Sequence, residues 1–204
     1  MLIDLSVPIN ERTPVYPGDP LIEIRQGGTV GVDGYQDHVI RLGTHIGTHI
    51  DAPSHMIDGG KSLDQFPLSH FVGRGVHVPV DDEFTLLRLE KADIRAGDIV
   101  LFETGMSTRY HEPDYFEDYP VITEEVAHYL VDKKIRIIGV DTCSPDKDPF
   151  AVHKILLSND VLIIENLTNL NQLAGKEFKV YALPLNVAMD GAPVRVAAEI
   201  KPTA

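Results

Sequence analysis

The sequence predicts a mixed α/β domain with a strand-rich sheet and a few helices around it. Its apolar runs are short and bounded by turn residues, as strands are. Segments with helical spacing fall between these runs, an alternation that is typical of α/β folds. With 204 residues, 43% of them hydrophobic, the chain can bury one sizeable core. We therefore expect a single domain over residues 1–204, without an internal repeat or linker.

Eight segments are predicted as strands. Each is a short run of mostly apolar residues between residues that favour turns. They are Leu2–Val7, Leu21–Arg25, His38–Gly43, Val72–Val80, Asp98–Phe102, Ile135–Val140, Val161–Ile164 and Lys179–Leu185.

Three segments are candidates for helices. Thr123 can accept hydrogen bonds from first-turn amides, and the two glutamates after it complement the helix dipole, so a helix is expected from here to about Lys133. A second helix is expected over Pro149–Leu157, with its apolar residues facing inward. A third candidate runs over Leu167–Leu173 and closes at Gly175.

Composition excludes several classes of protein. The 18 basic and 31 acidic side chains give a formal charge of −13, which repels nucleic acid and anionic lipid. No signal-like segment and no apolar run of about 18 residues is present, so we expect a cytoplasmic protein. The lone cysteine, Cys143, cannot form an intrachain disulfide or a thiolate cage, so any metal must be held by nitrogen and oxygen.

Three histidines and an aspartate crowd the stretch LGTHIGTHIDAPSHMIDGG: His45, His49, Asp51 and His55. Nine histidines in the whole chain would place about half a histidine in an eleven-residue window, yet this window holds three. The glycines and the proline predict an irregular loop. Imidazoles and carboxylates together suit zinc, manganese or iron(II). The alternative is a polar loop whose histidines hydrogen-bond to backbone carbonyls.

The spacing His-x-Gly-Thr-His-x-Asp-x-Pro-x-His resembles the signature of the cyclase superfamily of metal-dependent hydrolases, whose best-known members are bacterial kynurenine formamidases. The resemblance extends to four other parts of the chain, in the family's order. These are Ile3–Ser6, Thr13–Asp19 (TPVYPGD), Gly139–Ser144 (GVDTCS), and the segment Asp148–His153 followed by Glu165–Leu167.

The resemblance implies a binuclear metal site. His45, His49 and Asp51 would bind one ion, and Asp51 would also reach a second. His153 would ligate that second ion, and Glu165 would bridge the two. The cofactor implied is two zinc ions per subunit, with manganese as the alternative. From the residues alone, His153 could equally be a packed helix residue, whereas Glu165 follows an apolar strand where α/β proteins collect catalytic groups.

The resemblance also implies a role for His55, a fold and an assembly. His55 would be the general acid and base, since imidazole titrates near neutral pH. The fold implied is the swivelling β/β/α domain, with a mixed sheet core and peripheral helices. The assembly implied is a homodimer or homotetramer in which neighbouring subunits can line the active site.

Two further residues bear on the substrate and the chemistry. Tyr16, between prolines, could stiffen its loop or contact one face of a planar ligand. Kynurenine formamidases usually carry tryptophan at the matching place, which leaves the substrate open. Cys143 is interpreted as a buried thiol rather than a nucleophile. The acidic run 112–118 is interpreted as a solvated loop, where Tyr115 and Phe116 could border a pocket or a subunit contact.

The function predicted is metal-dependent hydrolysis of a non-peptide C–N bond in a small molecule, as in kynurenine formamidase (arylformamidase). N-formylkynurenine is the first substrate candidate. One alternative is hydrolysis of another cyclic amide, imide or lactone, as in isatin hydrolase. Another is a structural metal site, or a metal-dependent binding protein without turnover.

Overall fold

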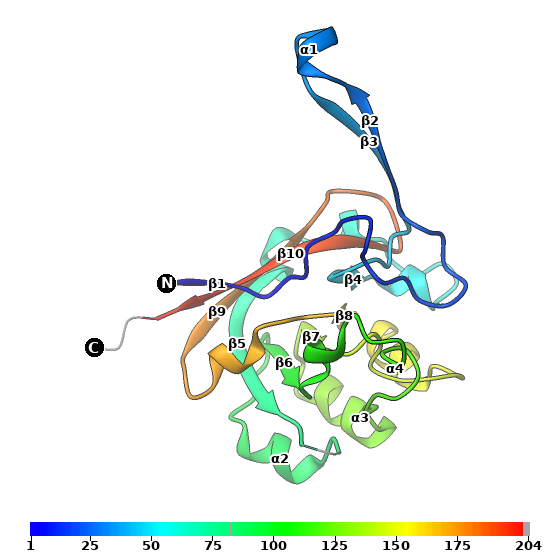
Figure 1. Cartoon of the computed structure of the whole chain (residues 1–204). Coiled ribbons are helices and arrows are strands. Elements are labelled where there is room, and N and C mark those ends of the chain that lie inside the picture. The colour runs from blue at the N-terminus through cyan, green and yellow to red at the C-terminus, as the bar shows by residue number, and fades with distance from the viewer. Residues whose placement is uncertain (82, 202–204) are drawn as a thin grey trace.

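The computed structural model describes residues 1–81 and 83–201 (Figure 1). Ten strands lie in these ranges: β1 (Leu2–Asp4), β2 (Glu23–Gly28), β3 (Asp37–Arg41), β4 (His49–Asp51), β5 (Val72–Pro79), β6 (Ile99–Glu103), β7 (Ile137–Val140), β8 (Leu162–Glu165), β9 (Phe178–Pro184) and β10 (Gly191–Ile200). The same ranges contain four α-helices: α1 (Val30–Asp33), α2 (Leu86–Lys91), α3 (Glu124–Asp132) and α4 (Ala151–Leu157).

Eight of the strands form one mixed sheet in the order β1-β10-β4-β8-β7-β6-β5-β9. Strands β5 to β8 are parallel, and the other pairings are antiparallel. Because β10 pairs with β4 through its first residues and with β9 through the rest, seven strands close into a barrel-like ring. The predicted strand-rich α/β class is confirmed.

One apolar core lies inside the ring and another packs against its outer face. The residues of β6 contribute alternately to the two cores. Ile99 and Leu101 face the inside of the ring, whereas Val100 and Phe102 belong to the cluster that packs under α2, α3 and α4. All four are fully buried, and each contributes roughly 1.5–3 kcal/mol through burial of its side chain. In Figure 1 these three helices lie together on the outer face of the parallel strands.

Helix α3 begins as predicted, because the Thr123 hydroxyl accepts a hydrogen bond from the Val126 amide at 3.3 Å. Helix α4 begins at Ala151, two residues after the predicted start, because Phe150 has a left-handed backbone with φ of 58°. The third candidate helix is wrong. Its segment contains only a 3-10 turn over Leu170–Leu173.

Four elements were not predicted: α1, α2, β4 and β10. Strand β10 is rich in alanine and contains Pro193, and both residue types are uncommon in strands. It nevertheless forms because two antiparallel partners and the core fix its register. The residues that lie in the ring, such as Val196 and Ala198, are fully buried. No described helix has the length and apolar character needed to cross a bilayer.

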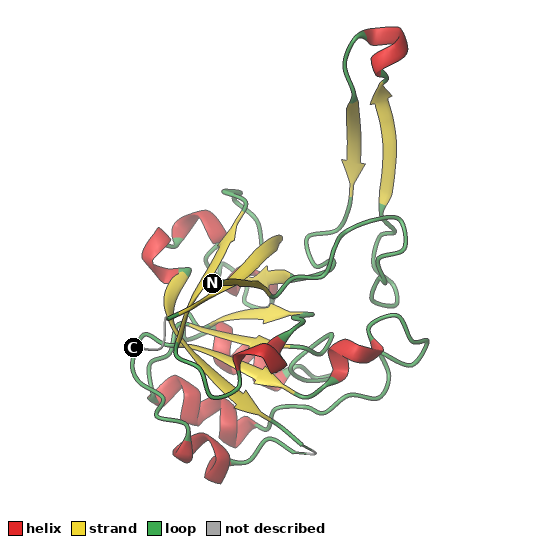
Figure 2. Ribbon diagram, turned by 60° about the vertical axis from the view of Figure 1, so that its left-hand side comes forward, coloured by secondary structure: helices red, strands yellow, loops and turns green. Residues whose placement is uncertain are grey.

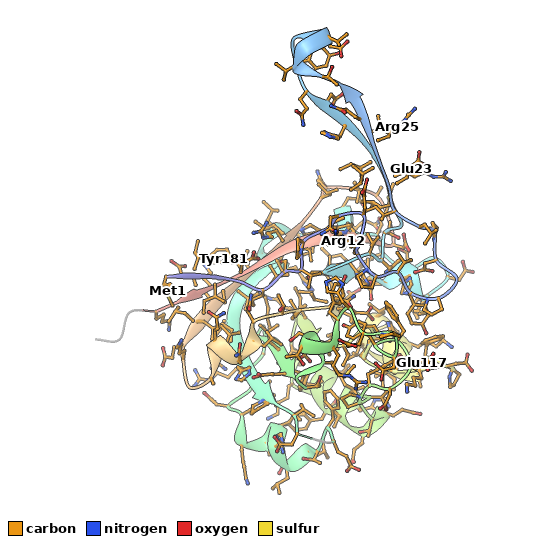
Figure 3. The ribbon with its side chains drawn as sticks, in the orientation of Figure 1. Met1, Arg12, Glu23, Arg25, Glu117 and Tyr181 are labelled. Atoms are coloured by element: carbon orange, nitrogen blue, oxygen red, sulfur yellow. The ribbon has the colours of Figure 1, made fainter. Side chains whose placement is uncertain are left out.

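Strands β2 and β3, joined by α1, form a separate hairpin over Glu23–Arg41, which we call the arm. Figures 1 and 2 show the arm extending away from the rest of the chain. Figure 3 shows the side chains of Glu23 and Arg25 on it, pointing away from the body. Every residue of β3 is exposed, including Val39 and Ile40. A two-stranded hairpin of this kind is marginally stable by itself.

Candidate metal centre

The histidine-rich stretch is largely the irregular segment that its glycines predict, but residues His49–Asp51 form a strand, β4, between β10 and β8. Side chains alternate along a strand, so His49 and Asp51 share one face while Ile50 enters the apolar core. Three residues flanked by Gly and Pro carry too little signal for a strand. The partners on both sides determine this one.

The turn before β4 orients His49. Gly47 has a left-handed backbone, with φ of 60°, which favours glycine. Its carbonyl oxygen accepts hydrogen bonds from His49 Nδ1 at 2.9 Å and from Asn166 Nδ2 at 3.0 Å. Because Nδ1 of His49 is engaged in this way, the lone pair of Nε2 is directed to the other side of the ring.

His153 is oriented in the same manner, by Asp146. One oxygen of Asp146 accepts from the amides of Val152 and His153 at 2.7 and 3.1 Å, and the other contacts His153 Nδ1 at 2.5 Å. This carboxylate therefore holds the start of α4 and the imidazole together. Nε2 of His153 is left to face the centre.

His45 lies between two carboxylates. Nδ1 is 2.8 Å from Asp51 Oδ1, and Nε2 is 2.7 Å from Asp190 Oδ2. Asp190 directly precedes β10, and the next residue must be glycine, since a Cβ on Gly191 would lie 2.7 Å from His45 Cε1. Asp190 thus plays for His45 the part that Asp146 plays for His153.

Asp51 and Glu165 each direct one oxygen towards His49 and the other towards His153, so each carboxylate faces both sides of the cluster. Asp51 directs Oδ1 towards His45 and His49, and Oδ2 towards His153 Nε2 at 3.8 Å. Glu165 lies opposite His49 in the strand register, with Oε2 3.2 Å from His49 Nε2 and Oε1 3.4 Å from His153 Nε2. The five residues assigned by resemblance to metal binding are thus brought together.

Two buried atoms at this point have no hydrogen-bond partner among the described residues: His49 Nε2 and Asp51 Oδ2. An unpartnered buried polar atom is costly, by about 1–3 kcal/mol, so such atoms usually have a function. A divalent cation would satisfy both. Nitrogen and carboxylate donors of this kind are the ones that zinc and manganese use, so the residues fit a metal site.

The carboxylates change how the histidines bind protons. Burial disfavours the imidazolium, but the carboxylates outweigh this effect and raise the pKa of His45 to about 9 and that of His153 to about 10. The pKa of the Asp51 carboxyl is lowered, because the facing imidazoles outweigh its burial. The metal-free centre therefore holds protons on His45 and His153 at neutral pH.

Metal binding at pH 7 should consequently release at least the protons carried by His45 and His153, because only neutral imidazole can be a ligand. Affinity should fall as the pH is lowered further below these pKa values. Calorimetric titration of the metal-free protein with zinc, in buffers of different ionisation enthalpy, measures the protons released. Zinc binding without proton release would contradict the assignment of these two histidines.

His55 lies beside the ligand cluster, at the end of a 3-10 turn over Pro53–His55. Its ring centroid is 3.9 Å from that of His45 and 5.9 Å from that of His153, and a quarter of its side chain is exposed. Burial, as the largest influence, lowers the pKa of His55, so the imidazole is neutral at pH 7. A neutral, accessible imidazole beside a metal centre can accept a proton.

A cavity of about 220 Å³ opens above the cluster. Its lining includes the candidate ligands His45, His49, His153 and Glu165, together with His55 and Met56. Three aromatic side chains also line it, and we call them the aromatic wall: Tyr16, Phe116 and Phe150, the last with its ring centroid 5.9 Å from that of His153. Phe116 thus borders a pocket, one of the two locations expected for it.

Cys143 also lines the cavity, but it is 4% exposed, and burial raises the pKa of its thiol to about 12. A protonated thiol is a poor nucleophile. The structure thus agrees with the interpretation of Cys143 as a buried thiol.

Sequence reasoning did not identify Asp146, Asn166 or Asp190. Asp146 lies between the two segments Gly139–Ser144 and Asp148–His153 that carry the resemblance, and it has no spacing signal of its own. Asn166 follows Glu165 directly, and its carbonyl and amide connect to Thr48 and Gly47. Asp190 is 145 residues from His45 in sequence, and only the pairing of β10 with β4 brings the two together.

Comparison with known proteins agrees with this geometry. A family model described as "Putative cyclase" matches residues 3–147. An uncharacterized protein of Methanocaldococcus jannaschii is 36% identical over 182 residues, covering 88% of this chain and 90% of the relative. A kynurenine formamidase of Bacillus thuringiensis is 32% identical, covering 98% of this chain and 97% of the relative. The structure of isatin hydrolase A from Labrenzia aggregata, bound to benzyl benzoate, has a TM-score of 0.88 and 27% identity, covering 97% of this chain and 93% of that one. The chain therefore belongs to the cyclase family of metal-dependent hydrolases.

Proposed function

We propose that this protein hydrolyses a non-peptide carbon–nitrogen bond in a small aromatic amide, as an arylformamidase does. The observation that carries the proposal is the convergence of three imidazoles and two shared carboxylates on the floor of a pocket with aromatic walls. Relatives at 32% identity are named kynurenine formamidase, so an N-formyl arylamine such as N-formylkynurenine is the first candidate. The likeness to isatin hydrolase A supports a cyclic amide as the second.

We propose two divalent ions per chain, zinc first and manganese as the alternative. His45 and His49 would hold one ion and His153 the other, with Asp51 and Glu165 shared between them, since each carboxylate faces both sides of the cluster. When bound, the ions supply Lewis acidity, which activates water and polarises the amide carbonyl.

The remaining chemistry falls to the chain's own residues. His55 accepts a proton from the attacking water as the new C–O bond forms, and returns it to the amide nitrogen as the C–N bond breaks, which yields a carboxylic acid and an amine. The aromatic wall shields the aryl group of the substrate from water and orients its carbonyl towards the cluster. Asp190 lies 3.6 Å from His55 Nδ1 and 2.7 Å from His45 Nε2, so it helps to hold both rings in place.

Hydrolysis of a substrate panel tests the proposed function. The panel contains formanilide, N-formylkynurenine, an isatin-like lactam and a cyclic imide, each assayed with the zinc-loaded and the manganese-loaded protein. We expect turnover of at least one aryl formamide. Turnover of only the lactam or the imide would favour the second candidate, and no turnover of any compound would overturn the proposal.

Chelation separates an enzyme from a structural metal site. An open catalytic site leaves the protein folded when its metal is removed, whereas a structural site unfolds with metal loss. Circular dichroism and hydrolysis, both measured before and after dialysis against a chelator, should show lost activity with a retained spectrum. Loss of the spectrum together with the metal would favour the structural alternative. Retained spectrum without any turnover, even after metal is restored, would favour a binding protein.

We also propose that the protein forms a homodimer or a larger assembly through the arm. The arm is a two-stranded ribbon with exposed apolar side chains, among them Val32 at 87% and Ile40 at 57% exposure. Such a ribbon gains stability when it is covered, and a two-fold contact between identical chains covers both arms at once.

The double variant Val32→Asp, Ile40→Lys should therefore be monomeric where the unmodified protein is not, by light scattering coupled to size-exclusion chromatography. Both side chains are exposed in the isolated chain, so the fold should be retained. Leu87→Asp, at an exposed position on α2, is the matched control and should leave the assembly intact. A wild-type protein that is monomeric at assay concentration would contradict this proposal.

A further inference from the structure

The pocket above the candidate metal centre selects an aryl group through its aromatic wall. Tyr16 and Phe116 meet edge to face, with ring centroids 5.6 Å apart, and Phe116 packs in the same way on Tyr115 at 5.2 Å. A planar ring of a substrate can add to this cluster by similar contacts. The wall does not distinguish one substituted aryl amide from another, so any finer selectivity must come from polar groups.

Outside the candidate metal cluster, where His45, His153 or bound ions supply positive charge, the described lining of the pocket carries no cation. Its ionisable groups are four histidines, the Cys143 thiol, the phenol of Tyr16 and the carboxylates of Asp19 and Glu165, and no lysine or arginine lines the pocket within the described ranges. Since Glu165 belongs to the candidate metal cluster, Asp19 is the carboxylate that remains for the substrate. A substrate anion at the aryl end, away from the metal cluster, would therefore have no basic side chain to pair with.

Two basic side chains of neighbouring loops are engaged elsewhere. Arg109 pairs with Asp114 at 2.5 Å. Lys147 donates a hydrogen bond to the carbonyl oxygen of Glu117 at 2.9 Å. Neither of them lines the pocket. The formal charge of −13 on the whole chain adds a long-range repulsion of anions.

Asp19 is placed at the pocket by a tight turn. Its amide donates to the Tyr16 carbonyl at 3.0 Å, and Gly18 takes the positive φ of 100° that the turn requires. The side chain of Asp19 is exposed and makes no hydrogen bond or ion pair with any residue that the structure describes. It is thus a free acceptor beside the aromatic wall.

We propose that Asp19 recognises an ammonium or other donor group on the aryl end of the substrate, and that the pocket disfavours a carboxylate there. This inference rests on the proposed function and deepens it. A substrate carboxylate would lose water without gaining a cation and would face Asp19. An ammonium group would instead gain a charge-assisted hydrogen bond. N-formylkynurenine carries both groups, so its carboxylate is the part that the pocket does not accommodate.

The test uses the metal-loaded enzyme and two compounds that differ only in that carboxylate: N-formylkynurenine and the primary amine obtained when its carboxyl group is replaced by hydrogen. We expect kcat/KM to be about tenfold or more higher for the amine. In Asp19→Asn, the ratio of kcat/KM for this amine to that for neutral formanilide should fall by about tenfold. Glu11→Gln, which removes the same charge from the same N-terminal segment outside the pocket, should leave that ratio unchanged.

Binding provides a readout that does not depend on turnover. The two arylamine products, with and without the carboxylate, should differ in calorimetric affinity in the same direction. Equal or better use of N-formylkynurenine would overturn the inference while leaving the proposed function in place. An unchanged ratio in Asp19→Asn would overturn the role of Asp19. If no aryl amide is hydrolysed, the proposed function fails, and the product affinities still decide whether the pocket prefers the amine.

Discussion

Replacement of His55 with alanine is expected to lower kcat by about two to four orders of magnitude, which is the usual contribution of a positioned acid–base group. Bound metal should stay near the wild-type amount. The reason is that His45, His49 and His153 each direct one ring nitrogen at a shared carboxylate, whereas His55 lies beside them, with its ring centroid 3.9 Å from that of His45. The measurements are steady-state kinetics and elemental analysis of dialysed protein.

The matched control is His128→Ala, which removes an imidazole from an exposed position on α3 and should change neither quantity. A His55→Ala protein with unchanged kcat would remove His55 from the mechanism. A protein that loses metal and activity together would instead make His55 a ligand, an arrangement in which it would join Asp51 and His153.

The part of the site that the sequence predicts best is the part that is close in sequence. Residues His45 to His55 converge because a few residues of chain connect them, and short loops close at little entropic cost. Their geometry was harder to predict. His49 and Asp51 share a face because they are two residues apart on β4, and β4 exists only because β8 and β10 lie on both sides of it.

The distal half of the site depends on sheet topology, which a single sequence does not show. His153 and Glu165 were assigned through resemblance to a family, and their own patterns left other interpretations open. The structure brings Glu165 beside His49 through the antiparallel register of β4 and β8. It brings His153 there because Asp146 holds both its imidazole and the first turn of α4.

Asp190 could not have been found in this way, since it belongs to the connection into a strand that was not predicted. Strand β10 alternates buried and more exposed residues, but this alternation is not visible as a hydrophobic pattern in the sequence, because several of its residues are alanine or proline. Its contribution is large, because it closes the ring and also places a carboxylate on His45. The arm illustrates the opposite case. Its strands were predicted approximately, but the apolar surface that it leaves exposed follows only from the fold.

Asp51→Asn and Glu165→Gln are expected to lower bound metal and activity together. Each substitution keeps the side-chain volume but removes the negative charge and one of the two oxygens that face the histidines. Loss of a residue that merely supports a ligand lowers metal affinity by about 10- to 100-fold, so loss of a shared ligand should lower it further. Elemental analysis after dialysis and competition with a chelator measure the affinity.

A graded set of variants makes this test specific to the proposed arrangement. Asp146→Asn, which disturbs only the support of His153, should fall in the range of about 10- to 100-fold. Asp118→Asn, an exposed acidic position, should have no effect and controls for net charge.

Because Asp51 and Glu165 each face both sides of the cluster, either substitution should reduce the metal content to less than one ion per chain rather than removing one ion and leaving the other. Full occupancy in both variants would refute the shared-carboxylate centre, whereas loss of exactly one ion in each would show that the two metal sites are held independently.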